Sequence, residues 1–117
     1  MNAHQKMVKE FHEAKGLTVK GEPIYLNKKD IVLRIKLIQE EFDEYKCHHT
    51  VADAADALGD LLYVVYGTAV SMGIDMEPVM REIHRSNMTK SNDKNEYGKI
   101  IKGKDFSPVD PKMFWVD

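Results

Sequence analysis

The stretch TVADAADALGDLLYVVYGTAVSMG, from Thr50 to Gly73, decides the fold class of this chain. Thr50 and Asp53 form a capping-box pattern that starts a helix, and Gly73 is a residue that commonly ends one. Between these signals apolar residues occupy nearly every face, which is typical of a helix buried on several sides. The stretch therefore predicts an all-α fold with this helix at its centre.

The residues before this stretch predict two more helices. Residues 1–15 place apolar side chains at helical spacing, and Gly16 follows as a stop. After an irregular connection, Asn27 with Asp30 predicts the start of a helix that reaches about residue 48. Steps of three and four residues mark its expected core stripe, which is Ile31, Ile35, Ile38, Phe42 and Tyr45.

The residues after the central stretch predict a fourth helix and a tail. Asp75 is a candidate cap for a helix over about residues 76–88. Residues 89–117 form a basic loop and C-terminal tail, for which we expect a loop or a short hairpin. We expect Phe114 and Trp115 to anchor this tail on the helices.

The composition fits one domain spanning residues 1–117. Hydrophobic residues make up 43% of the chain and charged residues 31%, which excludes a disordered protein. A formal net charge of -2 gives no overall field for nucleic acid, and the single cysteine fits a reducing compartment. No secretory leader opens the chain, and the longest apolar run, Leu61 to Val70, is far shorter than the about 20 residues of a membrane span. We expect a cytoplasmic protein that binds neither nucleic acid nor membrane.

Carboxylates gather near the end of the second predicted helix. In the run Glu40-Glu41-Phe42-Asp43-Glu44, helical spacing puts Glu41 and Glu44 at the edge of the buried stripe. Glu40 and Asp43 lie further round the helix, toward solvent. Such a run by itself is most often a solvated acidic face.

The central helix changes this interpretation. Its charged residues are Asp53, Asp56 and Asp60, which share one face and repel by roughly 0.2–0.5 kcal/mol per pair. Asp53 is explained by the cap with Thr50. Asp56, Asp60 and the mid-helix Gly59 are residues that disfavour a helix interior, and such exceptions tend to occur at functional sites. Carboxylates from two helices can converge on a divalent cation, and ligation by oxygen alone favours Mg²⁺ or Mn²⁺ over zinc.

The distribution of charge along the chain also indicates a ligand for this site. Residues 40–60 contain seven acidic side chains and one lysine. Residues 81–104 are basic instead, with Arg81, Arg85, Lys90, Lys94, Lys99, Lys102 and Lys104 against Glu82, Asp93 and Glu96. An acidic pole that holds a cation, together with a basic segment, matches the needs of a nucleotide's phosphates. Taken alone, the basic segment would be read as a solvated loop.

Longer motifs carry a resemblance to a known family. The runs EEFDE at residues 40–44 and DALGDLLY at residues 56–63 resemble the all-α nucleoside triphosphate pyrophosphohydrolases, which include MazG, the dimeric dUTPases and phosphoribosyl-ATP pyrophosphohydrolase. DALGDLLYVVYGTA, HRSNMTK and KGKDFSPVD are similar to the compact phosphoribosyl-ATP pyrophosphohydrolase-like subgroup. The resemblance covers residues from about Met7 to Asp110.

The resemblance implies a fold and a reaction. The fold would be a four-helix MazG-like bundle completed by homo-oligomerisation, as a dimer or a higher assembly. The apolar central helix points the same way, because short neighbouring helices cover only part of its surface. The reaction would be the Mg²⁺-dependent hydrolysis of a nucleoside or deoxynucleoside triphosphate between its α- and β-phosphates, giving a monophosphate and pyrophosphate.

The resemblance also implies roles for particular carboxylates. Matched by position to the family's E-E-x-x-E and E-x-x-D motifs, Glu41, Glu44 and Asp60 would be metal ligands, and Glu40 would orient or deprotonate the attacking water. The candidate catalytic residues are thus Glu40, Glu41, Glu44 and Asp60, and the candidate metal ligands are Glu41, Glu44, Asp56 and Asp60.

Asp56 is in the second set because the chain departs from the family motif at one position. Ala57 stands where the family has a fourth carboxylate. Asp56 is our candidate to replace it from one residue away, and the pair Asp53 and Asp56 in a shifted register is the alternative.

Candidate substrate contacts come from both ends of the chain. Arg85, Asn87, Lys90 and Lys104 are the candidates for contact with phosphate. Phe11, His12, Tyr63 and Tyr66 either line a pocket for the base or sugar or are ordinary core residues. The sequence does not choose the base. Three functions stay open. Two are enzymatic: removal of unwanted nucleotides, and the phosphoribosyl-ATP reaction of histidine biosynthesis. The third is a non-catalytic, metal-stabilised helical dimer that acts as a binding or regulatory module.

Overall fold

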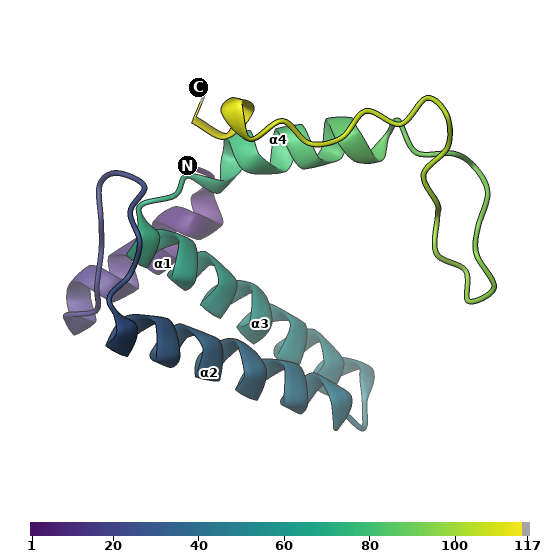
Figure 1. The fold of residues 1–117 in the computed structure, drawn as a ribbon. Coiled ribbons are helices and arrows are strands. Elements are labelled where there is room, and N and C mark those ends of the chain that lie inside the picture. Colours follow the sequence, from purple (N-terminus) through teal and green to yellow (C-terminus); the bar gives the residue numbers. More distant parts are fainter. Residues whose placement is uncertain (116–117) are drawn as a thin grey trace. The chain divides into compact units, whose positions relative to one another are not determined.

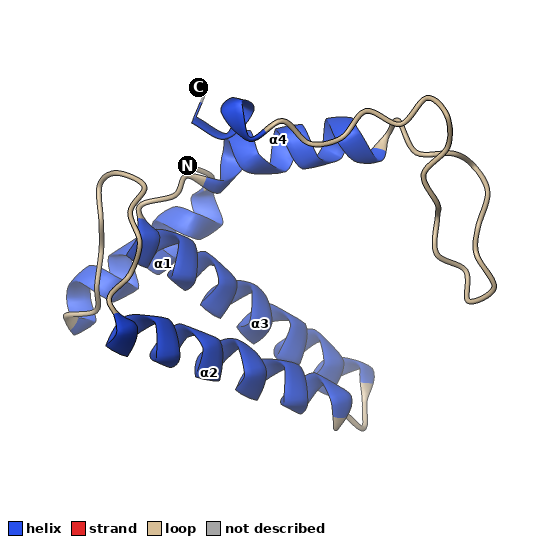
Figure 2. Ribbon diagram, in the orientation of Figure 1, coloured by secondary structure: helices blue, strands red, loops and turns tan. Residues whose placement is uncertain are grey.

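A computed structural model describes residues 1–115 of the protein. Four α-helices follow one another along the chain: α1 (Ala3–Lys15), α2 (Lys28–Lys46), α3 (Val51–Met72) and α4 (Met76–Asn87) (Figure 1). A short 3-10 helix, η1 (Pro111–Trp115), lies near the C-terminus. Within the described residues Figure 2 shows helices and loops but no strand, so the all-α prediction is confirmed.

Local signals place the helix ends as predicted. The Asn27 side chain accepts a hydrogen bond from the backbone N–H of Asp30 at 2.8 Å, and the Thr50 hydroxyl accepts one from Asp53 at 3.0 Å. Both caps satisfy backbone groups that a helix start leaves without partners. Gly16 and Gly73 end α1 and α3 at φ +70°, in the left-handed region that favours glycine.

The chain divides into two compact units, residues 1–75 and 76–117, which are described separately. In the first unit α3 packs against both α1 and α2, so its central position is confirmed (Figure 1). The buried apolar residues of this unit are Val8, Ala57, Ala69 and Val70. The prediction that residues 1–117 form one domain stays a prediction.

The expected core stripe on α2 was wrong except at Ile38, which is half-buried. Of the predicted stripe on α2, Ile35 is 62% exposed and Phe42 46% exposed, and Ile31 and Tyr45 are exposed as well. The face that α2 turns inward contains the buried Arg34 and the half-buried Leu37, Ile38 and Glu41 instead. The reason is that α2 has α3 as its main helical neighbour in the chain, and one neighbour covers one side.

The neighbouring helices cover only part of the apolar surface of α3, as expected. Leu58 is 47% exposed and Leu62 58% exposed, and Tyr63 and Val65 are exposed as well. Burial is concentrated toward the C-terminal end of the helix, from Gly67 onward. A Cβ atom added at Gly59 would meet nothing within 4 Å, so the chain itself does not explain this mid-helix glycine.

In the second unit, α4 packs against η1, which contains Phe114 and Trp115. The predicted loop between them is a hairpin-like turn with an antiparallel bridge between Lys94 and Ile100. Within residues 1–115 no single helix is long and apolar enough to cross a membrane, and only α3 and α4 taken as a broken pair have the length and composition.

The buried carboxylate of Glu82 holds this unit together. It accepts hydrogen bonds from Arg85 Nε and Nη2, both at 2.7 Å, and from the Asp110 backbone N–H at 2.8 Å. The hydrogen bonds from Arg85 lower the pKa of Glu82 most, followed by the bond from Asp110, and the pKa falls to about 2. Glu82 therefore ties α4 to the tail through its ionised form.

Replacing Glu82 with Gln should loosen the tail. Because its pKa lies below the ordinary 4.5, ionised Glu82 contributes stability above pH 4.5 that is lost as the pH falls toward 2. In E82Q, we expect the Asp110 amide to exchange hydrogen faster at neutral pH, with little further change on acidification. The control is E96Q, in the exposed loop, which should exchange like the unmodified protein.

Candidate active site

Two helices bring three carboxylates together. Glu41 and Glu44 from α2 and Asp60 from α3 each offer an oxygen, and these oxygens all lie within 4.8 Å of one another. One oxygen of Glu41, Oε2, is buried and has no hydrogen-bond partner among the described residues. A buried carboxylate oxygen without a partner is costly unless a ligand satisfies it. These residues fit a divalent cation, because hard cations prefer carboxylate oxygens.

The pKa values in the cluster show that holding these carboxylates close together disfavours their ionised forms. Partial burial raises the pKa of Glu41 to about 7, followed by a side-chain hydrogen bond with Glu44 and by the charges of Glu44, Asp60 and Glu40 in that order. Burial also raises the pKa of Asp60, followed by the charges of Asp56 and Glu44. A bound cation would remove this penalty, since it favours the ionised form of each carboxylate.

Metal-free protein should lose stability as the pH rises from 4.5 to about 7. The folded state holds the Glu41 proton more tightly than the unfolded state does, so deprotonation favours unfolding over this interval. Thermal unfolding in chelator should show the fall, and E41Q should remove much of it. In E10Q, on exposed α1 surface, the fall should persist. Because the lowered pKa of His12 adds stability as the pH rises over the same interval, the readout is the difference between unmodified protein and E41Q, and the absence of any difference would contradict the assignment.

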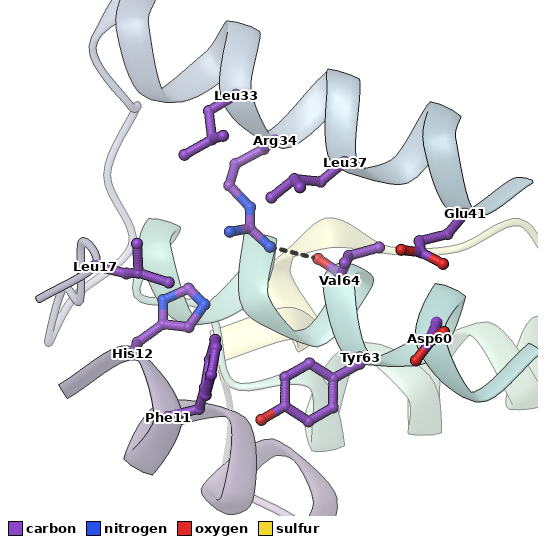
Figure 3. Close-up of a pocket in the computed structure, with 10 residues that line it drawn as sticks. All are labelled: Phe11, His12, Leu17, Leu33, Arg34, Leu37, Glu41, Asp60, Tyr63 and Val64. Carbon is purple, nitrogen blue, oxygen red and sulfur yellow. Dashed lines mark hydrogen bonds between the residues drawn. The ribbon is translucent and has the colours of Figure 1, made fainter. Parts of the chain in front are cut away.

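The cluster lies at one end of a cleft of about 410 Å³ between α1, α2 and α3 (Figure 3). Glu41 and Asp60 line that end, and Arg34 and His12 line the other. Apolar side chains form the walls between them, including Leu37, Tyr63 and Val64. Of the aromatic candidates from the sequence, Phe11, His12 and Tyr63 line this cleft, whereas Tyr66 lines a neighbouring hollow.

The remaining acidic candidates lie outside the three-carboxylate cluster. Glu40 is exposed on α2, next to Glu41 of the cluster. Asp53 is engaged at the start of α3, where its backbone N–H is capped by Thr50 and its carboxylate accepts from the His49 N–H at 3.4 Å. Asp56 is exposed and lines a small polar hollow beside Glu44.

The four candidates for phosphate contact belong to the second unit. Arg85 is engaged there, since it binds Glu82 and also donates to Ser107 Oγ at 2.9 Å and to the Pro108 carbonyl at 3.0 Å. Asn87 ends α4, and both Asn87 and Lys104 are exposed. The backbone N–H of Lys90 donates to the Asn87 carbonyl at 3.1 Å.

Arg34 is a polar residue of the cleft that was not predicted from the sequence. Its guanidinium is almost fully buried, with the residue 5% exposed, and it donates to Thr68 Oγ1 at 3.1 Å and to the Val64 carbonyl at 2.9 Å. The available signal was its helical register, because Arg34 lies three residues after Ile31 and four before Ile38, on an apolar side of α2.

The fold and the cluster define the class of protein. The domain is helical and directs carboxylates from two packed helices toward one point at a cleft, an arrangement that fits a divalent cation. The model of the family "Phosphoribosyl-ATP pyrophosphohydrolase" matches residues 5–87, and the chain belongs to this family. The protein is therefore a pyrophosphohydrolase, a hydrolase that acts on phosphoanhydride bonds of nucleotides. A search of curated proteins finds no match.

Proposed function

We propose that this chain hydrolyses a nucleoside or deoxynucleoside triphosphate between the α- and β-phosphates, with Mg²⁺, to a monophosphate and pyrophosphate. The observation that carries the proposal is the three-carboxylate cluster with its unpartnered Glu41 oxygen, placed at one end of a cleft. Family membership supports the reaction class, and a cation held by the cluster would bind the phosphates.

Glu41, Glu44 and Asp60 would hold the metal. Bound Mg²⁺ would supply charge neutralisation for the phosphates and a lowered pKa for water. In the reaction a water oxygen bonds to the α-phosphorus, the bond from that phosphorus to the bridging oxygen breaks, and pyrophosphate leaves. Glu40 is the residue we assign to orient or deprotonate this water, because it adjoins the cluster and is open to solvent.

The proposal includes contributions from the rest of the chain. Arg85, Asn87, Lys90 and Lys104 would contact phosphate, and the cationic segment would serve its own site or that of a second copy. The exposed apolar faces of α2 and α3 support a homodimer or a higher homo-oligomer. We place the activity in the cytoplasm.

A panel of substrates tests the proposal. Purified protein is incubated with Mg²⁺ and each of the nucleoside triphosphates, the deoxynucleoside triphosphates and phosphoribosyl-ATP, and pyrophosphate is measured. We expect release from at least one triphosphate, with the monophosphate as the other product and no activity in chelator. Release of inorganic phosphate with a diphosphate would show cleavage at a different bond and would contradict the proposal.

Two other outcomes identify the alternatives. The description of the matching family favours phosphoribosyl-ATP as a second candidate substrate, and hydrolysis of that compound alone would assign the chain to histidine biosynthesis. A blank panel combined with stoichiometric Mg²⁺ binding would indicate a metal-stabilised binding or regulatory module.

Asp56 and Asp53 should differ as metal ligands. If Asp56 replaces the carboxylate missing at Ala57, D56N should weaken Mg²⁺ binding about ten- to hundredfold, as loss of groups around a metal does. D53N should leave Mg²⁺ affinity nearly unchanged, since Asn also caps a helix well. Titration calorimetry of both variants measures this, and the reverse ranking would favour the shifted register.

A further inference from the structure

The end of the cleft opposite the carboxylates presents a second polar site. Arg34 precedes Glu41 by two helical turns on α2, so the two side chains start about 10 Å apart at a rise of 1.5 Å per residue. The walls between them are mostly apolar. This cleft suits an elongated ligand that is charged at one end and polar at the other, with a flat or apolar middle.

Arg34 offers a hydrogen-bond donor at this end. Its Nε and Nη2 atoms bind Thr68 and Val64, but no hydrogen bond from Nη1 and no ion pair to a carboxylate is found within residues 1–115. A buried guanidinium without a carboxylate partner is costly. The fold nevertheless buries Arg34 to 5% exposure, at a position where the cleft reaches it (Figure 3).

His12 offers an acceptor beside this donor. Its Nδ1 lies 3.1 Å from the Thr18 carbonyl, which can only accept, so Nδ1 carries the hydrogen and Nε2 of the neutral ring is an acceptor. Burial, opposed by the Thr18 hydrogen bond and aided by the charge of Arg34, lowers the pKa of His12 and keeps the ring neutral at pH 7.

Gly67 leaves room for this pair. A Cβ atom at that position of α3 would lie 2.4 Å from Arg34 Nη2 and 2.8 Å from His12 Nε2, so both nitrogens sit directly over the glycine. Nη2, which already donates to Val64, and the acceptor Nε2 therefore lie side by side over the glycine, and both side chains line the same end of the cleft (Figure 3).

We propose that Arg34 and His12 recognise the hydrogen-bonding edge of the nucleotide base, with Nη1 of Arg34 donating to a carbonyl oxygen or a ring nitrogen and His12 Nε2 accepting from the neighbouring N–H. This inference rests on the proposed function, which puts the phosphates at the carboxylate end. A phosphate is a poor occupant of the Arg34 end, because it has no N–H for Nε2 and its oxygens would face the Nε2 lone pair. The rise of about 10 Å along α2 between Arg34 and Glu41 leaves room for the sugar between a base at one end and phosphates at the other.

Two variants test the pair against a substrate that lacks a base. H12N keeps an amide near the Nδ1 position that can donate to Thr18, but it removes the Nε2 acceptor. R34K keeps the positive charge but loses the planar guanidinium with its several N–H donors. We expect H12N to lower kcat/KM for the preferred triphosphate about tenfold, and R34K about ten- to hundredfold. For ribose 5-triphosphate both variants should match the unmodified protein. The control is H4N, the same substitution at an exposed histidine of α1.

Nitrogen NMR of His12 in the unmodified, metal-free protein provides a readout that is independent of hydrolysis and of variant folding. We expect at least one of the four nucleoside 5′-monophosphates to shift the Nε2 resonance, and ribose 5-phosphate to leave it in place. The base assignment would be overturned if the variants lost kcat/KM equally on the nucleoside triphosphate and on ribose 5-triphosphate. It would also be overturned if no monophosphate shifted the Nε2 resonance. Neither result would affect the proposed reaction. An Nε2 shift in a protein that hydrolyses no triphosphate would support the pair and refute the proposed function.

Discussion

Replacing Glu41 with Gln is expected to abolish Mg²⁺-dependent pyrophosphate release. Gln matches the size of Glu but removes the ligand charge, so the cluster loses its most buried oxygen donor. A metal that stabilises phosphate charge contributes several kcal/mol to the transition state, which corresponds to a rate loss of at least about a thousandfold. We expect the same for E44Q, with Mg²⁺ affinity reduced in both variants and the helical content unchanged.

The matched control for this prediction is D43N. Asp43 belongs to the same acidic run, but its carboxylate pairs with Lys46 at 3.2 Å and accepts from Gln39 at 3.0 Å, outside the cluster. Its loss should change turnover little, because an exposed ion pair contributes little. Full Mg²⁺-dependent activity in both E41Q and E44Q would refute the site assignment.

The second large effect concerns assembly. We expect light scattering to give the unmodified protein a mass of at least two chains, because Leu58, Leu62 and Val65 lie on one exposed face of α3. Leu62 also lines an apolar hollow with Met7 and Gly59, and the open space at that glycine allows close approach of another helix. L62E should convert the assembly into single chains, because a second copy would have to bury its charge.

Dissociation should have measurable consequences for stability. The melting temperature of the unmodified protein should rise with protein concentration, since assembly stabilises the folded state by mass action, and that of L62E should not. Y25E is the control, because Tyr25 is 91% exposed in the connection before α2. A single-chain mass that persists when unmodified protein is concentrated would refute the proposed interface.

Local chemistry made the helices predictable. The signals that begin and end the helices involve residues only a few positions apart, so their effect can be predicted without knowing the fold. They are the caps Asn27 with Asp30 and Thr50 with Asp53, and the glycines at 16 and 73. The candidate site was partly predictable for the same reason. Helical periodicity alone puts Glu41 and Glu44 on neighbouring positions of one helix edge.

Contacts between helices were not predictable in this way. The periodic stripe on α2 has apolar residues on more than one side, and the expected core side, with Ile35 and Phe42, is exposed in the single chain. Choosing between the sides depends on which helices are available to cover them. That is a property of the whole chain and, in our proposal, of its assembly.

Residue types and their spacing were enough to predict that this protein is helical, roughly where its helices begin and end, and which carboxylates are candidates for a metal. These features follow from hydrogen bonds and periodicity over a few residues. Packing between helices, in contrast, brings Asp60 to Glu41 and Glu44, leaves Oε2 of Glu41 without a partner among the described residues, and buries Arg34 beside His12 over Gly67. Each of these depends on residues far apart in the chain, whose packing fixes distances and burial that no local pattern encodes.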